Sequence, residues 1–195
     1  MKIYGLTGGI AAGKSEASRR FEERGVPVID ADGLGHVTLA PGGRAEQAVI
    51  EAFGEEILTD GRIDREKLGG IVFGDAEALS RLNGLVHPAV GEEMAARTQA
   101  LEQEGHAAII VEAALHAEDG TLRPGMDALI LVECPRDERV RRLMEDRAMT
   151  ESEAVRRIES QTPPEKKREL ARWVIMNDQD VEHLRQQVDA IVEEL

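Results

Sequence analysis

The sequence predicts an α/β fold in which helices flank a parallel sheet. Two short runs, 107–111 and 128–132, have the unbroken hydrophobicity of strands that are buried on both faces. Stretches with helical periodicity separate the apolar runs along the chain. Strands that alternate with helices imply right-handed parallel connections. The 195 residues are enough for one domain with a mobile sub-region.

The first two strands enclose a helix. A strand at 2–6 is followed by a helix at 14–24, in which Ala17 and Phe21 share one face and which Gly25 ends. The predicted strands, in chain order, are 2–6, 26–29, 107–111, 128–132 and 173–176. The last helix begins near Val181, and its single apolar stripe indicates core packing without chemistry.

The segment from Asp32 to Gly105 is mostly helical in pattern. Asp64 and Asp75 are placed to cap two of its helices. Pro88 disfavours a helical conformation at the preceding residue, so we expect a helix boundary at His87. A long helical insertion between strands suits a region that binds an acceptor molecule.

The C-terminal third is basic and divided by turns. Residues 136–172 hold 11 lysines and arginines against 9 acidic residues, in a chain whose net charge is −14. Two sequences, 150–153 and 162–165, place Thr at a helix N-cap and Glu three residues later, which predicts capping boxes and three short helices. Such helices suit either a mobile lid that contacts an anion or static packing with solvated, paired charges.

Composition excludes several classes of protein. The acidic net charge argues against general binding to nucleic acids or membrane surfaces. No apolar run approaches the roughly 18 residues that a membrane span needs, and no signal peptide is apparent. The one cysteine, Cys134, fits a reducing compartment. We therefore expect a cytoplasmic protein, as a monomer or weak homo-oligomer.

A phosphate loop is the strongest functional signal. Gly8, Gly13, Lys14 and Ser15 match the pattern G-x-x-x-x-G-K-[ST] between a strand and a helix. Its backbone N–H groups would face a phosphate, Lys14 would reach the β/γ oxygens, and the Ser15 hydroxyl would bind Mg²⁺. The predicted ATP contacts are Gly8, Gly9, Ile10, Ala11, Ala12, Gly13, Lys14, Ser15 and Glu16.

The remaining motifs favour a small-molecule kinase. A GTPase usually has N-K-x-D after a strand, and the nearest run, 177–180, lacks the lysine. The signature of a transporter ATPase is absent. Asp30 and Asp32 follow the second strand, where a carboxylate would accept a proton from an acceptor hydroxyl, orient Mg²⁺, or only form an Asx turn or helix cap. Glu112 follows the third strand and suits a water-mediated contact with Mg²⁺ or plain exposure.

The motifs together resemble the dephospho-coenzyme A kinase family. The likeness includes "LTGGIAAGKS", "VPVIDAD", "DGRIDREKL", "LNGLVHPAV" and the "WVIMN" tail. It implies a three-layer P-loop NTPase fold with a parallel sheet, a helical acceptor-binding region and a helical lid. The single domain would comprise a core at about 1–32, 106–135 and 172–195, an acceptor region at about 33–105 and a lid at about 136–171.

The resemblance also implies an activity and roles for residues. The reaction is ATP-dependent phosphorylation of the ribose 3′-hydroxyl of dephospho-CoA, the last step of coenzyme A synthesis, with Mg²⁺. Asp32 resembles the catalytic base or hydroxyl-orienting acid, with Asp30 in support. The residues implied in acceptor binding or the lid are Arg65, Asn83, His87, Arg142, Arg147 and Gln161.

Some positions depart from the family pattern. The lid pattern R-L-x-x-R-D has its last Arg and Asp exchanged here, at Asp146 and Arg147. The other departures are Ala12, Glu16, Arg172, and Ala114 and His116 on either side of Leu115, where the family's P-L-L-x-E pattern lacks its proline and one leucine before Glu118. We expect Ala12 to be tolerated if its φ is negative. The alternatives to an active kinase are a nucleotide- or CoA-binding protein with little activity and a kinase for another hydroxyl acceptor.

Overall fold

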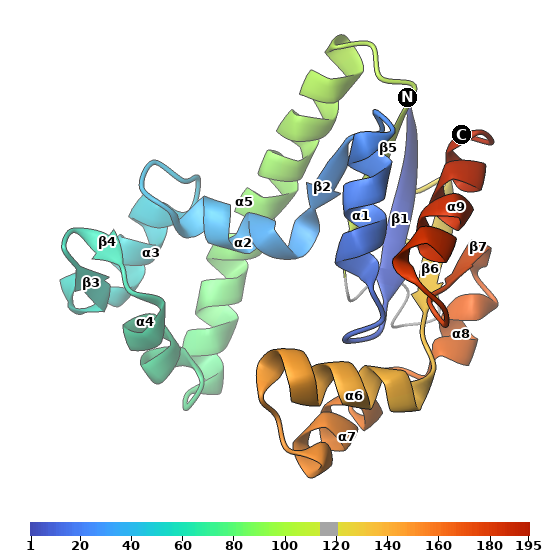
Figure 1. The fold of residues 1–195 in the computed structure, drawn as a ribbon. Coiled ribbons are helices and arrows are strands. Elements are labelled where there is room, and N and C mark those ends of the chain that lie inside the picture. Colours follow the sequence, from blue (N-terminus) through green and yellow to red (C-terminus); the bar gives the residue numbers. More distant parts are fainter. Residues whose placement is uncertain (114–120) are drawn as a thin grey trace. The chain divides into compact units, whose positions relative to one another are not determined.

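The computed structural model describes residues 1–113 and 121–195. The described chain divides into two compact units (Figure 1). Residues 1–30 and 101–195 form one, here called the core unit, and residues 31–100 form the other, here called the helical unit. Each unit has its own cluster of buried apolar side chains.

A five-stranded parallel sheet is the frame of the core unit, as the apolar runs predict. Its strand order is β2-β5-β1-β6-β7, and every neighbouring pair is parallel. The strands are β1 (Lys2–Gly8), β2 (Val28–Asp30), β5 (Ala108–Glu112), β6 (Ala128–Glu133) and β7 (Ala171–Met176). The central strand β1 therefore leads directly into the phosphate loop.

Both faces of the sheet are covered. Ile109 and Ile110 are successive residues whose side chains point to opposite faces, and both are fully buried. On one face, α1 (Lys14–Glu23) and α9 (Val181–Val192) lie side by side (Figure 1). The buried stripe of α9, Leu184, Val188 and Ile191, joins the apolar cluster of the core unit, as its spacing predicts.

Phe21 of α1 carries much of this packing. It has no exposed surface and lies in the core-unit cluster. Replacing Phe21 with alanine should lower the free energy of unfolding by about 3–5 kcal/mol, because a large buried ring leaves a cavity. Urea unfolding, followed by the fluorescence of the single tryptophan, Trp173, measures this effect, since Trp173 packs against the same cluster.

The matched control for this prediction is Phe73→Ala. Phe73 is 84% exposed in the helical unit, so its removal should leave that unfolding transition unchanged. Equal losses in the two variants would contradict the assigned position of Phe21 in the core.

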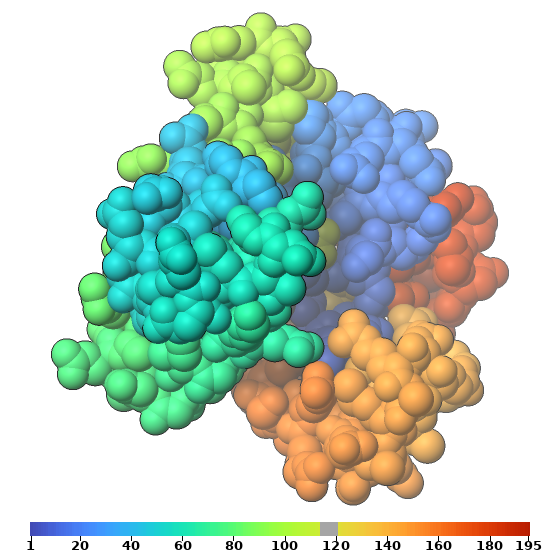
Figure 2. Space-filling view, turned by 90° about the vertical axis from the view of Figure 1, so that its left-hand side faces the viewer, coloured from blue at the N-terminus to red at the C-terminus, as the bar shows by residue number. Residues whose placement is uncertain are grey.

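The helical unit surrounds a second apolar cluster, to which Val49, Ile57, Leu68 and Val72 contribute. Its elements are α2 (Ala31–Leu39), α3 (Glu46–Phe53), the 3₁₀-helix η1 (Glu55–Ile57), β3 (Leu58–Thr59), β4 (Arg62–Ile63), α4 (Arg65–Val72) and most of α5 (Ala76–Gln103). Figure 2 shows the face on which α3 and the β3–β4 hairpin meet solvent.

The two caps predicted in the helical unit are confirmed. The Asp64 carboxylate accepts hydrogen bonds from the backbone N–H groups of Glu66 and Lys67 at the start of α4. The Asp75 carboxylate accepts from the N–H groups of Glu77 and Ala78 at the start of α5. Each cap satisfies N–H groups that have no partner within the helix.

The predicted helix boundary at His87 is wrong, because α5 continues through Pro88. Leu85 and Val86 on one side of the proline, and Ala89 on the other, pack into the apolar cluster of the helical unit. An internal proline costs a helix about 3 kcal/mol. Packing on both sides of Pro88 outweighs the local preference on which the prediction was based.

The basic segment forms three helices of the core unit, α6 (Arg136–Arg147), α7 (Glu151–Glu159) and α8 (Pro164–Arg168). The Thr150–Glu153 capping box is confirmed at the start of α7. The box predicted at Thr162 is wrong, since Pro163 is the N-cap of α8 and no side chain caps that helix. Pro164 occupies the first position of α8, where proline needs no N–H partner.

Candidate active site

The loop between β1 and α1 has the backbone of an anion cradle. Ala11 and Gly13 are left-handed, with φ of 59° and 100°, whereas Ala12 between them does not have a positive φ and is tolerated as expected. Alternation of this kind turns successive N–H groups toward a common concavity. A side chain at Gly13 would also collide with the amide of Asn177, which donates a hydrogen bond to the Ala12 carbonyl at 2.8 Å.

Lys14 is held by a carboxylate at the end of the neighbouring strand β5. Its Nζ lies 2.7 Å from Glu112 Oε1, and both side chains are largely buried. The Ser18 hydroxyl donates to the other carboxylate oxygen of Glu112. The ion pair keeps the Lys14 ammonium at the carboxyl end of the sheet. The phosphate loop, which directly precedes α1, lies beside it.

A cavity of about 530 Å³ opens over the loop. Eight of the nine predicted ATP contacts, Gly8 to Ser15, lie in its wall, and Glu16 does not. The opposite wall comes from the three-helix segment and includes Arg142, Arg147 and Gln161. The structure thus brings the phosphate loop and both predicted arginines to one cavity.

The exchanged pair Asp146 and Arg147 lies at the end of α6, and both residues border this cavity. A helix places successive side chains about 100° apart, so the exchange could have turned the arginine away. Arg147 nevertheless borders the cavity together with Asp146, at the last helical residue before the left-handed Ala148. The cavity wall therefore contains a guanidinium and also a carboxylate.

Arg142 joins this wall to the loop. Its guanidinium donates to the Ala11 carbonyl and to the Asn177 side chain, both at 3.4 Å, and to Glu138 at 2.9 Å. The hydrogen bond from Arg141, aided by Arg142, lowers the pKa of Glu138 to about 2. Glu138 consequently stays ionised at neutral pH and orients Arg142 along the helix.

Arg139 was missed by the sequence analysis. It is 8% exposed, and its Nε donates to the Ile10 carbonyl at 2.8 Å. Gln161 Oε1 accepts hydrogen bonds from both the Ile10 N–H at 2.8 Å and Arg139 Nη2 at 3.0 Å. The one signal in the sequence is the spacing of four residues to Leu143, which places Arg139 on the buried face of α6.

Glu16 turns toward α9 instead of the cavity. Its carboxylate lies 2.8 Å from Arg185 Nε and also pairs with Arg19. Replacing Arg185 with alanine should raise the KM for ATP by about threefold to tenfold, because a less neutralised carboxylate beside the loop repels a triphosphate. Steady-state kinetics with varied ATP measure the change.

Glu16→Thr in the Arg185→Ala background should restore the KM, since it removes the repelling charge. Arg24→Ala serves as the control, because Arg24 pairs with Asp189 on the same two helices without touching Glu16. A KM that stays high in the double variant would indicate a structural role for Arg185.

The predicted acceptor residues lie on several elements. Asp30 ends β2 directly opposite Glu112 in the ladder, and Asp32 is in the first turn of α2. Arg65 begins α4. Asn83 and His87 are four residues apart on α5, hence on one face of that helix.

The remaining departures from the family pattern fall in two places. Arg172 lies on β7, where its guanidinium stacks on the ring of Trp173 at 4.3 Å. This contact gives the arginine a packing role. Ala114, Leu115 and His116, with the nearby Glu118, lie outside the described residues.

The described residues contain no group of three or more His, Cys, Asp and Glu side chains arranged to hold a metal ion by themselves. In the same residues, no helix combines the length and apolarity that a membrane crossing requires.

The parallel sheet, the phosphate loop after its central strand and the arginines across the cavity define the class of P-loop kinases. A comparison with protein families narrows this class, since the dephospho-CoA kinase profile matches residues 2–183. The chain belongs to the dephospho-CoA kinase family, which confirms the resemblance seen in its motifs.

Individual relatives agree with this assignment. The dephospho-CoA kinase of Geobacillus kaustophilus is 42% identical over 191 residues, which cover 97% of this chain and 94% of that protein. The dephospho-CoA kinase of Carboxydothermus hydrogenoformans is 41% identical over 194 residues, with coverage of 99% and 94%. The solved dephospho-CoA kinase of Campylobacter jejuni superimposes with a TM-score of 0.68 at 25% identity, over 99% of this chain and 96% of that chain.

Proposed function

We propose that this protein transfers the γ-phosphoryl group of ATP to the 3′-hydroxyl of dephospho-CoA, giving coenzyme A and ADP. The observation that supports this most is the cavity in which Lys14 and the phosphate loop face Arg142 and Arg147. Phosphoryl transfer needs positioning and charge neutralisation more than covalent chemistry from the protein. Membership of the dephospho-CoA kinase family supports dephospho-CoA as the acceptor.

The proposed roles follow from where charge moves during transfer. The loop N–H groups and Lys14 bind the β- and γ-phosphates, and the two arginines neutralise charge on the equatorial γ-oxygens. The bond from γ-phosphorus to the β,γ-bridging oxygen breaks as the 3′-oxygen attacks. Asp32 orients that hydroxyl and takes its proton, with Asp30 in support. Arg65, Asn83 and His87 bind the acceptor.

Mg²⁺ is the proposed cofactor, and two groups of the core unit suit it. The Ser15 hydroxyl lies in the wall of the phosphate cavity. The Glu112 carboxylate is close by, since it pairs with Lys14 of the same loop. Ser15 would hold the ion directly, and Glu112 would hold it through water once the phosphates draw Lys14 away. When bound there, Mg²⁺ would supply neutralisation of the negative charge on the phosphates.

One observation favours a second candidate, a nucleotide- or CoA-binding protein with little activity. Asp146 adds a carboxylate to the wall that should attract phosphate. The first experiment measures ADP release from Mg²⁺-ATP with and without dephospho-CoA, and identifies the product by mass. A matched acceptor that lacks only the 3′-hydroxyl is the control.

An active kinase should release ADP only with dephospho-CoA and yield one product that carries a 3′-phosphate. ATP binding without acceptor-dependent ADP would favour the binding protein. Turnover of the acceptor that lacks the 3′-hydroxyl would exclude the proposed site of transfer.

A further inference from the structure

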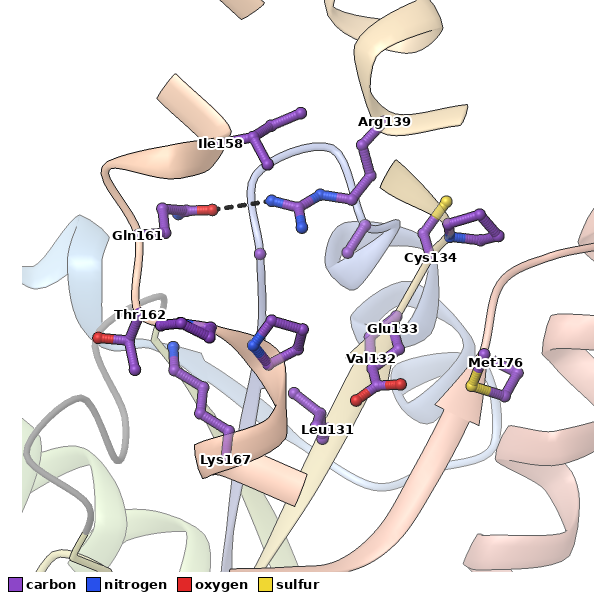
Figure 3. A pocket seen from close by; sticks show the side chains of 15 residues that line it. Leu131, Val132, Glu133, Cys134, Arg139, Ile158, Gln161, Thr162, Lys167 and Met176 are labelled. Carbon is purple, nitrogen blue, oxygen red and sulfur yellow. Dashed lines mark hydrogen bonds between the residues drawn. The ribbon is translucent and has the colours of Figure 1, made fainter. Parts of the chain in front are cut away.

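A second cavity, of about 200 Å³, lies at the base of the three-helix segment (Figure 3). The end of β6, from Leu131 to Pro135, forms one side. The connection between α7 and α8, with Gln161, forms another. The point where the chain leaves the sheet for α6 therefore borders this space, as does the connection within the three-helix segment. It has no part in the proposed reaction.

This cavity is separate from the phosphate cavity. The two share Gly9, Ala12 and Gln161 in their walls, so the phosphate loop and Gln161 form the partition between them. Most of the remaining wall is apolar. Figure 3 shows Ile158 and Met176 on different sides of the space, and Val132 below.

Arg139 extends its guanidinium into this space (Figure 3). Among the described residues it donates two hydrogen bonds, to the Ile10 carbonyl and to Gln161, both neutral acceptors, and its Nη1 donates none. Within the described residues no carboxylate lies within ion-pair distance of it. Burial lowers the pKa of Arg139, and the nearby Cys134 thiol opposes this shift only in part.

The other polar groups of the wall do not neutralise Arg139. Glu133 is paired with Arg168. Burial raises the pKa of the Cys134 thiol and keeps it uncharged. Lys167 is 4% exposed, and its side chain extends toward the same space (Figure 3). A buried charge without a counter-ion is costly, so an anion beside Arg139 would be stabilised.

The size and the walls restrict what this anion can be. A cavity of about 150 Å³ with apolar walls accommodates benzene, and the present space is somewhat larger. We infer that the cavity is a binding site for a small organic monoanion, namely a carboxylate on an apolar body about the size of a benzene ring. The carboxylate lies against Arg139, and the body contacts Ile158, Met176 and Val132.

The site is coupled to nucleotide binding by its geometry. Arg139 and Gln161 are the residues that fix the peptide groups of Ile10 in the phosphate loop. An occupant that accepts hydrogen bonds from Arg139 competes with these contacts. Binding of the anion should therefore change the KM for ATP.

The test uses the full chain with ¹³C-labelled methionine and isoleucine methyl groups. Benzoate is titrated while the methyl signals of Ile158 and Met176 are followed by NMR, with the exposed Met144 as the internal reference. Benzyl alcohol, an uncharged molecule of similar size, and inorganic phosphate are the comparison probes. We expect saturable chemical-shift changes at the methyl groups of Ile158 and Met176 with benzoate, and none with benzyl alcohol or phosphate.

Two variants locate the site. Arg139→Met should weaken benzoate binding by about tenfold or more, because a charge-assisted hydrogen bond is lost. Ile158→Phe should block benzoate binding by filling the cavity. If Arg139→Met fails to fold, Ile158→Phe still tests whether benzoate binds in this cavity. Arg136→Met, on the exposed part of the same helix, should bind benzoate normally.

Several outcomes would overturn the inference. Equal binding of benzyl alcohol would mean an apolar cavity without anion recognition. Binding of phosphate but not benzoate would contradict the ligand class. Unchanged benzoate affinity in Ile158→Phe, or no shift at either methyl group in the wild type, would exclude this cavity as the site. None of these results depends on kinase activity.

Discussion

Replacing Asp32 with asparagine should lower kcat by about 10²–10⁴-fold, the range over which a positioned general base contributes. The amide keeps the size of the side chain but neither takes a proton nor carries charge. The phosphate loop is unaltered, so ATP should bind with unchanged affinity. Single-turnover kinetics with dephospho-CoA, together with calorimetry of ATP binding, separate the two effects.

Asp60→Asn is the matched control for this variant. Asp60 is an exposed residue of the same helical unit, and its left-handed φ of 51° suits asparagine. It should turn over like the wild type. Normal turnover by Asp32→Asn would show that another group receives the proton, and a loss of ATP affinity would show that Asp32 acts in nucleotide binding.

Replacing Arg147 with alanine should reduce kcat by about 10³-fold or more, with a smaller effect on the KM for ATP. An arginine that meets the transferring phosphoryl group stabilises charge that is greatest in the transition state. Arg136→Ala is the control, since Arg136 begins the same helix, is exposed and pairs with Glu159. Equal activity of the two variants would assign Arg147 to the surface.

The double exchange Asp146→Arg with Arg147→Asp is a complementary test of the same cavity wall. It restores the order of residues that is usual in the family. Because both positions already border the phosphate cavity, the exchanged enzyme should keep activity within about tenfold of the wild type. A gain of several orders of magnitude would mean that the natural arrangement is poorly competent.

The sheet and the phosphate loop were predictable because local signals specify them. Buried parallel strands read as short apolar runs, and all five predicted strands correspond to strands of the sheet. The loop follows from the conformational needs of glycine and from the lysine and serine after it. The caps at Asp64, Asp75 and Thr150 were predictable for the same reason, since each acts within three residues of itself.

The errors arose where distant packing opposes a local rule. Pro88 signals a boundary, but apolar contacts on both sides of it keep α5 continuous. The backbone of Ala11 is left-handed, and because the residue is not a glycine, the sequence does not indicate this conformation. Arg139 is an arginine in a basic segment, and its helical spacing to Leu143 indicates a buried face but not the contact with the phosphate loop, which the fold reveals. The roles of Asp30, Asp32, Arg65, Asn83 and His87 remain predictions.

The order of the strands in the sheet determines when, during synthesis of the chain, the nucleotide site can fold. The first strand, β1, pairs on both sides with strands that are synthesised much later, since Lys2 is opposite Ala108 and Tyr4 is opposite Ala128. Asn177, which completes the phosphate loop, is made later still. A nascent chain on the ribosome therefore carries the ATP-binding motif early but gains a folded nucleotide site only after residue 177 has been synthesised. Until then the apolar β1 segment lacks both of its partner strands, and unpaired apolar strands of this kind are prone to aggregation.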